Sequence, residues 1–293
     1  MTFRPRRSVL YMPGSNTRAL EKARTLTADA FIFDLEDAVA PDAKAEARDR
    51  VCAAVKAGGY DGREVVVRIN ALDTPWGADD LKAAAAAGPD AVLLPKPNNA
   101  ADIVRACAEL AKAGAPDTMR LWAMVETPLA VLNIRDLAGA VRSGAARLDC
   151  LVLGTNDLVK ETRAEMTADR VAALYWLSSA VTAARAFSLD VLDGVYNNFK
   201  DADGLQRECR QGRQLGFDGK TLIHPDQIAA ANEIFAPEEA EVAWARKIIA
   251  AFDEPANKGK GVVTVEGRMV ELLHAEIARR TVAVADAIAR RSL

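Results

Sequence analysis

The sequence predicts an α/β protein, and three observations favour a closed (β/α)₈ barrel, the TIM barrel. Short apolar runs alternate eight times with stretches of helical periodicity over residues 1–235. The runs are continuously apolar, as in parallel strands that are buried on both faces. A chain of 293 residues also suits one barrel with an appendage. An open doubly wound sheet is the alternative, but residues 12–16 do not form the glycine-rich phosphate loop that such sheets usually carry.

Each expected strand ends at turn-forming or polar residues and precedes a helix. The strands are expected at residues 8–12, 30–35, 65–69, 91–94, 121–125, 151–153, 189–192 and 219–223. The helices are expected at residues 15–26, 42–57, after Trp76-Gly77, and at 100–112, 129–144, 167–187, 201–215 and 225–235.

The last part of the chain, residues 236–293, is expected to form a C-terminal helical extension that packs on a barrel or covers an active site as a lid. Residues 237–252 read as an amphipathic helix and residues 253–261 as a flexible connector. A short strand at 262–265 and a helix at 269–291 with one apolar side would follow.

Composition excludes several classes of function. The net charge is −3 with acids and bases interspersed, which favours neither nucleic acid nor an anionic membrane as a partner. No apolar run reaches the length of a membrane span, and no signal-peptide core begins the chain. The four cysteines stand singly, as expected of thiols in a reducing compartment. We therefore expect a cytoplasmic protein.

Two acids mark a candidate metal site. Glu126 follows the fifth expected strand, which Pro128 prevents from continuing, and Asp157 follows the sixth. Carboxyl ends of parallel strands meet at one face, which carries the chemistry of α/β proteins. Two oxygen donors without nearby histidine or cysteine suit a Mg²⁺ ion that keeps positions open for water and substrate.

Further charged residues follow other strands. Glu36 and Asp37 follow the second strand, Arg68 ends the third, and Lys96 follows the fourth. The arginine fork can grip a carboxylate in two places. This rim predicts a small anionic substrate held between a metal ion and Arg68.

The chain resembles the HpcH/HpaI aldolase and citrate lyase beta-subunit-like family, which includes malyl-CoA, β-methylmalyl-CoA and citramalyl-CoA lyases. The segments that carry the resemblance appear in order: RSVLYMPGSN (7–16), FDLEDAV (33–39), VRINALDTPWG (67–77), ETP (126–128), LGTNDL (153–158) and GFDGKTLIHPDQI (216–228). The resemblance implies a barrel that forms homotrimers or hexamers, with a coenzyme A thioester lying across its mouth.

The resemblance also implies roles for single residues. Glu126 and Asp157 would hold Mg²⁺, or Mn²⁺, and the Glu36–Asp37 pair would hold its water molecules. Arg7, Arg68, Lys96 and Glu126 are expected among the substrate-binding residues.

Members of this family make or break a carbon–carbon bond between an acyl-CoA and a 2-keto acid such as glyoxylate or pyruvate. Arg68 is expected to stabilise the thioester enolate, and Asp37 and Glu271 complete the expected catalytic set. In the CoA lyases the corresponding tail residue is usually an aspartate that reaches an active site, typically in a neighbouring subunit. Here Glu271 takes that position, in the expected first turn of the last helix. Glu271 would move a proton at the enolate carbon.

Other chemistries remain as alternatives. The protein could hydrolyse a malyl-CoA thioester, act like the citrate lyase beta subunit on a carrier-bound acyl group, or be a catalytically dead paralogue. A Ser–His–Asp triad is disfavoured because GxSxG is absent and only His224 of the two histidines follows a strand. A Schiff-base mechanism would need a lysine such as Lys96 or Lys220.

Overall fold

Eight parallel strands close into a barrel, which confirms the predicted fold and excludes the open sheet. The computed structural model describes residues 3–144 and 146–291, and within them each strand pairs with the next and β8 pairs with β1. The strands are β1 (Ser8–Pro13), β2 (Ala30–Asp34), β3 (Glu64–Arg68), β4 (Ala91–Leu94), β5 (Arg120–Val125), β6 (Leu148–Leu153), β7 (Asp190–Asp193) and β8 (Gly219–Leu222).

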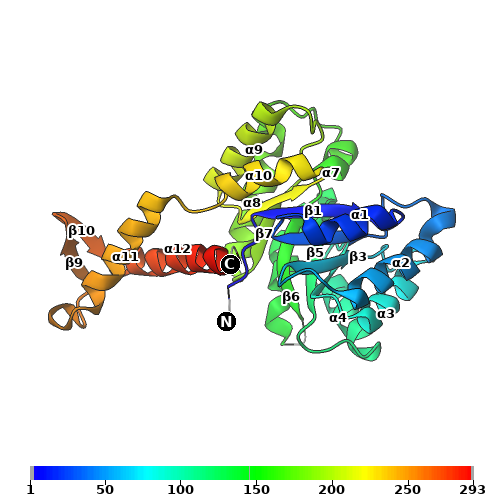
Figure 1. Ribbon diagram of the computed structural model, residues 1–293, viewed down its shortest axis with the longest axis horizontal. Coiled ribbons are helices and arrows are strands. Elements are labelled where there is room, and N and C mark those ends of the chain that lie inside the picture. Colours follow the sequence, from blue (N-terminus) through cyan, green and yellow to red (C-terminus); the bar gives the residue numbers. More distant parts are fainter. Residues whose placement is uncertain (1–2, 145, 292–293) are drawn as a thin grey trace. The chain divides into compact units, whose positions relative to one another are not determined.

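Helices separate the strands and lie on the outside of the barrel, as α2, α3 and α4 show in Figure 1. They are α1 (Thr17–Lys22), α2 (Lys44–Ala57), α3 (Gly77–Ala87), α4 (Ala100–Lys112), α5 (Pro128–Leu132), α6 (Ile134–Gly139), α7 (Thr155–Thr162), α8 (Leu174–Ala186), α9 (Ala202–Leu215) and α10 (Ile228–Ile234). Short 3₁₀ turns lie at Ala23–Thr25, Pro41–Ala43, Ala140–Ser143, Val171–Ala173 and Pro225–Gln227.

Alternation along the strands fills the barrel interior. Residues two apart on a strand point to the same side, so every second side chain faces inward. The inward residues form one buried cluster: Val9, Ala30, Ile32, Val66, Ala91, Leu93, Trp122, Met124, Cys150, Val152 and Leu192. Continuing the same alternation toward the carboxyl ends brings the charged residues Asp34, Arg68 and Glu126 to the mouth of the barrel.

Two helical regions differ from the sequence-based expectation. The helix expected at 129–144 is divided into α5, α6 and a 3₁₀ turn. The helix expected at 167–187 begins only at Leu174, and α7 precedes it as a separate element. Arg163, with a φ of 58°, takes the left-handed conformation that ends α7, and Arg170, with a φ of 54°, directly precedes the 3₁₀ turn at Val171–Ala173. Periodicity alone did not reveal these two interruptions.

The C-terminal segment contains a β-hairpin between two helices. Its elements are α11 (Glu239–Asp253), a 3₁₀ turn at Pro255–Asn257, β9 (Val262–Val265), β10 (Arg268–Glu271) and α12 (Leu272–Arg291). The expectation that the last helix begins at residue 269 is therefore wrong, because residues 269–271 belong to β10 and the helix begins at Leu272. Glu266 and Gly267 have φ of 49° and 78°, as the two-residue turn of a tight hairpin requires. β10 pairs antiparallel with β9.

The chain divides into two compact units. One is the barrel, Arg6–Asn232, and the other comprises Glu233–Leu293 with Met1–Pro5. The second unit has its own apolar core, which includes Ile248 of α11, Val263 of β9 and Ala275 of α12. Among the described residues, no helix is both long and apolar enough to cross a membrane.

Candidate active site

A cavity of about 350 Å³ opens at the carboxyl ends of the barrel strands. It brings together most of the rim residues expected from the sequence, with side chains contributed by β1, β2, β3, β5 and β6. Its lining consists of Tyr11, Pro13, Asp34, Asp37, Ala38, Arg68, Met124, Glu126, Leu153, Gly154, Thr155, Asn156, Asp157, Val195 and Ile223.

Arg68 forms the positive side of this cavity. Its side chain is 7 % exposed, and its guanidinium is gripped by both oxygens of Asp34, with Nε–Oδ1 and Nη2–Oδ2 distances of 2.7 and 2.6 Å. Asp34 also accepts the backbone N–H groups of Glu36 and Ala38. One carboxylate therefore orients both the arginine and the loop that follows β2.

Asp34 was not singled out by the sequence analysis, which considered only the acids beyond the strand. A detectable signal existed, because Ala30, Ile32 and Asp34 lie on the same inward face of β2. A charged residue at the inward position of an apolar strand requires a partner, and Arg68 on the neighbouring strand supplies one.

The acidic pair after β2 lies on the other side of Arg68. Glu36 Oε2 is 2.8 Å and Asp37 Oδ2 is 3.2 Å from Arg68 Nη1. Glu36 Oε2 forms an ion pair with Arg68, but the angle does not allow a hydrogen bond. Among the described residues, this oxygen has no hydrogen-bond partner. Burial raises the pKa of Glu36 to about 7 against the opposing charge of Arg68, and the neighbouring Asp37 and Asp34 add to the rise.

Glu126 is the more buried of the two expected metal ligands, and only 2 % of its surface is exposed. Burial, followed by the charge of Glu36, raises its pKa to about 8, although Arg68 and Lys96 oppose this. The backbone at residue 154 makes room for it, since a Cβ at Gly154 would approach Glu126 Cβ to 2.4 Å and Oε2 to 2.8 Å.

Lys96 connects the two expected metal ligands. Its backbone N–H donates to Glu126 Oε1 at 2.9 Å, and its Nζ lies 2.9 Å from Asp157 Oδ2. Burial lowers the pKa of Lys96, but Asp157 and Glu126 more than offset this and the net pKa is raised. The backbone of Lys96 has a φ of 53°, an uncommon conformation for a residue other than glycine.

The donor set fits a divalent cation that prefers oxygen. Glu126 and Asp157 line the same cavity, and burial together with the charge of Glu36 raises the pKa of Glu126, so that a cation beside it would stabilise the ionised carboxylate. Among the described residues, no three acidic, histidine or cysteine side chains form a ligand cluster. A cation held by two carboxylates would take its remaining oxygen ligands from water and substrate, as Mg²⁺ commonly does.

Arg7 and Glu271, two predicted site residues, are not among the residues that line the cavity. Arg7 precedes β1 and pairs with Asp29, which precedes β2, through Nε–Oδ2 and Nη2–Oδ1 distances of 2.8 and 2.9 Å. Both lie at the amino-terminal end of the barrel, so Arg7 does not line the cavity, and its role in substrate binding stays a prediction. Glu271 belongs to the C-terminal unit, where it ends β10 instead of lying in the first turn of α12, and its N–H donates to His274 Nδ1.

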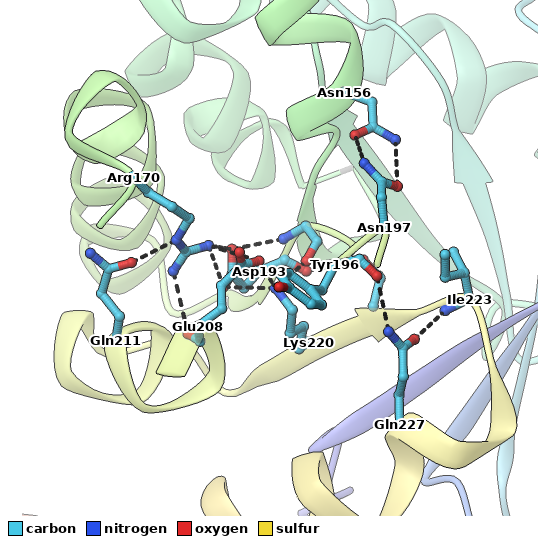
Figure 2. Close-up of polar contacts among 12 residues, drawn as sticks. Asn156, Arg170, Asp193, Tyr196, Asn197, Glu208, Gln211, Lys220, Ile223 and Gln227 are labelled. Carbon is cyan, nitrogen blue, oxygen red and sulfur yellow. Dashed lines mark hydrogen bonds and ion pairs between the residues drawn. The ribbon is translucent and has the colours of Figure 1, made fainter. Parts of the chain in front are cut away.

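The loop after β7 forms another part of the rim. Asn197 in this loop exchanges two hydrogen bonds, of 2.7 and 3.3 Å, with Asn156, the neighbour of Asp157 in the chain. Gln227 donates to the carbonyl of Tyr196 at 2.9 Å, and Lys220 Nζ donates to the carbonyl of Gly194. Figure 2 shows these contacts holding the loop at several points.

Behind this loop lies a buried ion network. Arg170 Nη1 contacts both oxygens of Asp193 at 2.8 Å, while Lys220 Nζ lies 3.2 Å from Asp193 and 2.5 Å from Glu208 (Figure 2). Lys220 is fully buried, and although burial lowers its pKa, Asp193 and Glu208 raise it above the ordinary value. A protonated, enclosed lysine is not a Schiff-base nucleophile.

Comparison with known proteins identifies the family. A model of the HpcH/HpaI aldolase/citrate lyase family matches residues 7–225. The chain belongs to this family. The resemblance drawn from the sequence segments is therefore confirmed.

Relatives in this family cover nearly the whole chain. A (3S)-malyl-CoA thioesterase of Cereibacter sphaeroides is 50 % identical over 285 residues, covering 97 % of this chain and 96 % of the relative. The citrate lyase subunit beta of Escherichia coli is 36 % identical, covering 92 % and 89 %. The crystal structure of CitE from Mycobacterium tuberculosis with magnesium, acetoacetate and coenzyme A has 31 % identity and a TM-score of 0.73, with 95 % and 97 % covered. These relatives establish an enzyme of the citrate lyase beta-like type.

Proposed function

We propose that this protein is a Mg²⁺-dependent carbon–carbon lyase that acts on a 3-hydroxyacyl-CoA, such as malyl-CoA, β-methylmalyl-CoA or citramalyl-CoA. The products would be an acyl-CoA and a 2-keto acid, glyoxylate or pyruvate. One observation carries the proposal: a buried arginine faces the same cavity as two carboxylates suited to a cation, Glu126, which is buried, and Asp157, which is half-buried. That arrangement binds an anionic 2-keto acid and places positive charge beside the thioester that is cleaved from it.

Glu126 and Asp157 are proposed to hold the metal, which when bound would act as a Lewis acid toward the keto-acid oxygens. In cleavage, a base removes the proton of the 3-hydroxyl group, and the bond to the thioester's α-carbon breaks. The electron pair passes to the thioester carbonyl oxygen, and the α-carbon then gains a proton. Arg68 stabilises the negative charge of the enolate, and Lys96 adds positive charge beside Asp157.

Asp37 and Glu271 complete the proposed catalytic set. The side chain of Asp37 is 68 % exposed and touches Arg68, so it can hold water at the edge of the cavity. Glu271 is proposed as the acid/base group, supplied by the C-terminal unit of the same or a neighbouring subunit in a homotrimer or hexamer. Glu271 provides a carboxylate on a side chain one methylene longer than that of aspartate, which would alter which acyl-CoA is preferred.

Hydrolysis is a second candidate, which the 50 % identical (3S)-malyl-CoA thioesterase favours. Water would add to the same thioester carbonyl, and the carbon–sulfur bond would break to give free coenzyme A and malate. A carrier-bound acyl substrate, as implied by the likeness to citrate lyase subunit beta, is a third variant of the same site chemistry.

One experiment separates these reactions. The protein is incubated with (3S)-malyl-CoA and Mg²⁺, and the products are resolved by mass spectrometry. Lyase activity yields acetyl-CoA and glyoxylate in equal amounts, whereas hydrolysis yields malate and free thiol. Chelation of the metal with EDTA should abolish the reaction. Absence of both product pairs, with β-methylmalyl-CoA and citramalyl-CoA also unreacted, contradicts the proposed function.

A further inference from the structure

Tyr11 is a cavity residue to which neither the resemblance nor the proposed mechanism gives a role. It lies on β1, with its ring packed against the barrel core and exposed in part to the cavity. The guanidinium carbon of Arg68 lies 5.0 Å from the ring centroid. The phenol is therefore held beside the arginine that the reaction uses.

The hydroxyl group of Tyr11 is poorly satisfied. The hydrogen bond that the described residues offer it runs to Met124 Sδ at 4.0 Å, and a thioether sulfur is a weak acceptor. Enclosed tyrosine hydroxyls usually find a better partner than this. Burial raises the pKa of Tyr11, with Asp34 and Glu126 adding to the rise against the charge of Arg68, so the phenol remains a donor at neutral pH.

A second donor points at the same sulfur atom. Arg68 Nη1 lies 3.7 Å from Met124 Sδ, so the arginine and the phenol converge on one point at the floor of the cavity. Both distances are long, and both donors lie on the cavity lining. An oxygen atom that entered beside Met124 would receive a hydrogen bond from each. Two fixed donors aimed at one position are the arrangement that stabilises a developing oxyanion.

We propose that Tyr11 is a catalytic residue that donates a hydrogen bond to the thioester carbonyl oxygen and, together with Arg68, forms a two-donor oxyanion site. This inference rests on the proposed thioester substrate, but it holds for either reaction at that thioester. In cleavage the carbonyl oxygen becomes the enolate oxygen. In hydrolysis it becomes the oxyanion of the tetrahedral adduct. Negative charge grows on the same atom in both cases.

The test is Tyr11→Phe, which removes one oxygen and keeps the ring under Arg68. Loss of one oxyanion donor typically lowers kcat by about 10²–10³-fold. We expect a decrease of that size, with KM, the Kd for Mg²⁺ measured by calorimetry, and Tm all near the wild-type values. A structural role would instead change Tm or the Mg²⁺ affinity. Tyr60→Phe is the matched control, since Tyr60 is also buried, does not line the cavity, and donates its hydroxyl proton to the carbonyl of Ala54 in α2 at 3.3 Å.

The possible outcomes test the role of Tyr11 separately from the proposed function of the protein. If the wild-type protein turns over (3S)-malyl-CoA and Tyr11→Phe has the same kcat, the proposed role of Tyr11 is overturned and the proposed function stays intact. A raised KM at constant kcat also overturns it, because the hydroxyl would then bind substrate and transition state equally. A wild-type protein that forms neither product pair overturns the proposed function and, with it, the thioester oxygen as the partner of Tyr11.

Discussion

Replacing Asp34 by asparagine should destabilise the barrel. The side chain of Asp34 is 2 % exposed, and its carboxylate accepts hydrogen bonds from both Nε and Nη2 of Arg68. Asparagine retains one acceptor oxygen and turns an amide N–H₂ toward the other guanidinium nitrogen. Removing one partner of a buried ion pair typically costs about 3–5 kcal/mol. We expect about 3 kcal/mol, the lower end, because Glu36 still lies beside the guanidinium.

The measurement is thermal unfolding of the two proteins followed by circular dichroism. For a barrel of this size, about 3 kcal/mol corresponds to a Tm decrease of roughly 6–12 °C. Asp37→Asn provides the matched control, since it is the same chemical change at a carboxylate that contacts the same guanidinium. Its side chain is 68 % exposed, and exposed pairs are worth at most about 1 kcal/mol.

The comparison of these two variants decides the argument. If Asp34→Asn and Asp37→Asn lowered Tm by the same small amount, burial would not be what makes the Asp34–Arg68 pair important. The orientation of Arg68 would then have to depend on Tyr11 and Glu36 instead.

Three further predictions concern activity. Glu126→Gln and Asp157→Asn should each abolish metal-dependent turnover and weaken Mg²⁺ binding measured by calorimetry while preserving the fold; retained Mg²⁺ affinity in Glu126→Gln would remove it from the site. Arg68→Lys keeps the charge but loses the planar fork, so kcat/KM should drop by at least about 10²-fold; near-normal kinetics would contradict the role given to Arg68. Glu271→Gln should lower kcat by about 10²–10⁴-fold with unchanged Mg²⁺ affinity, and Glu271→Asp should restore part of it; full activity in Glu271→Gln would show that Glu271 carries no proton.

The barrel could be predicted because its strands are short apolar runs that end in recognisable turn residues. The rim charges followed from the same reasoning, since a charge just beyond a buried strand must lie at the barrel mouth. Arg68, Glu126 and Asp157 were found in this way and do line one cavity. Their roles as ligands and catalysts stay predictions.

Where the structure differs from the sequence-based expectations, the difference has a physical cause that the order of residues along the chain does not show. Arg7 precedes its strand and so lies at the opposite end of the barrel, bound to Asp29. Asp34 is the last residue of a strand, so it was not found when only the charged residues beyond the strand ends were considered. The strand at 262–265 was expected, but its partner β10 was missed because residues 269–271 were assigned to the start of the last helix. The left-handed Glu266-Gly267 turn reverses the chain between the two strands.

The buried network of Arg170, Asp193, Glu208 and Lys220 has a consequence for how this sequence can drift. Two positive and two negative groups meet there, so their formal charges cancel. Any single substitution that changes charge leaves an uncompensated ion in an enclosed space, whereas replacing an opposite pair together preserves the balance. Evolution at these four positions is therefore constrained to proceed by joint replacement, and descendants that alter one must carry a compensating change at another.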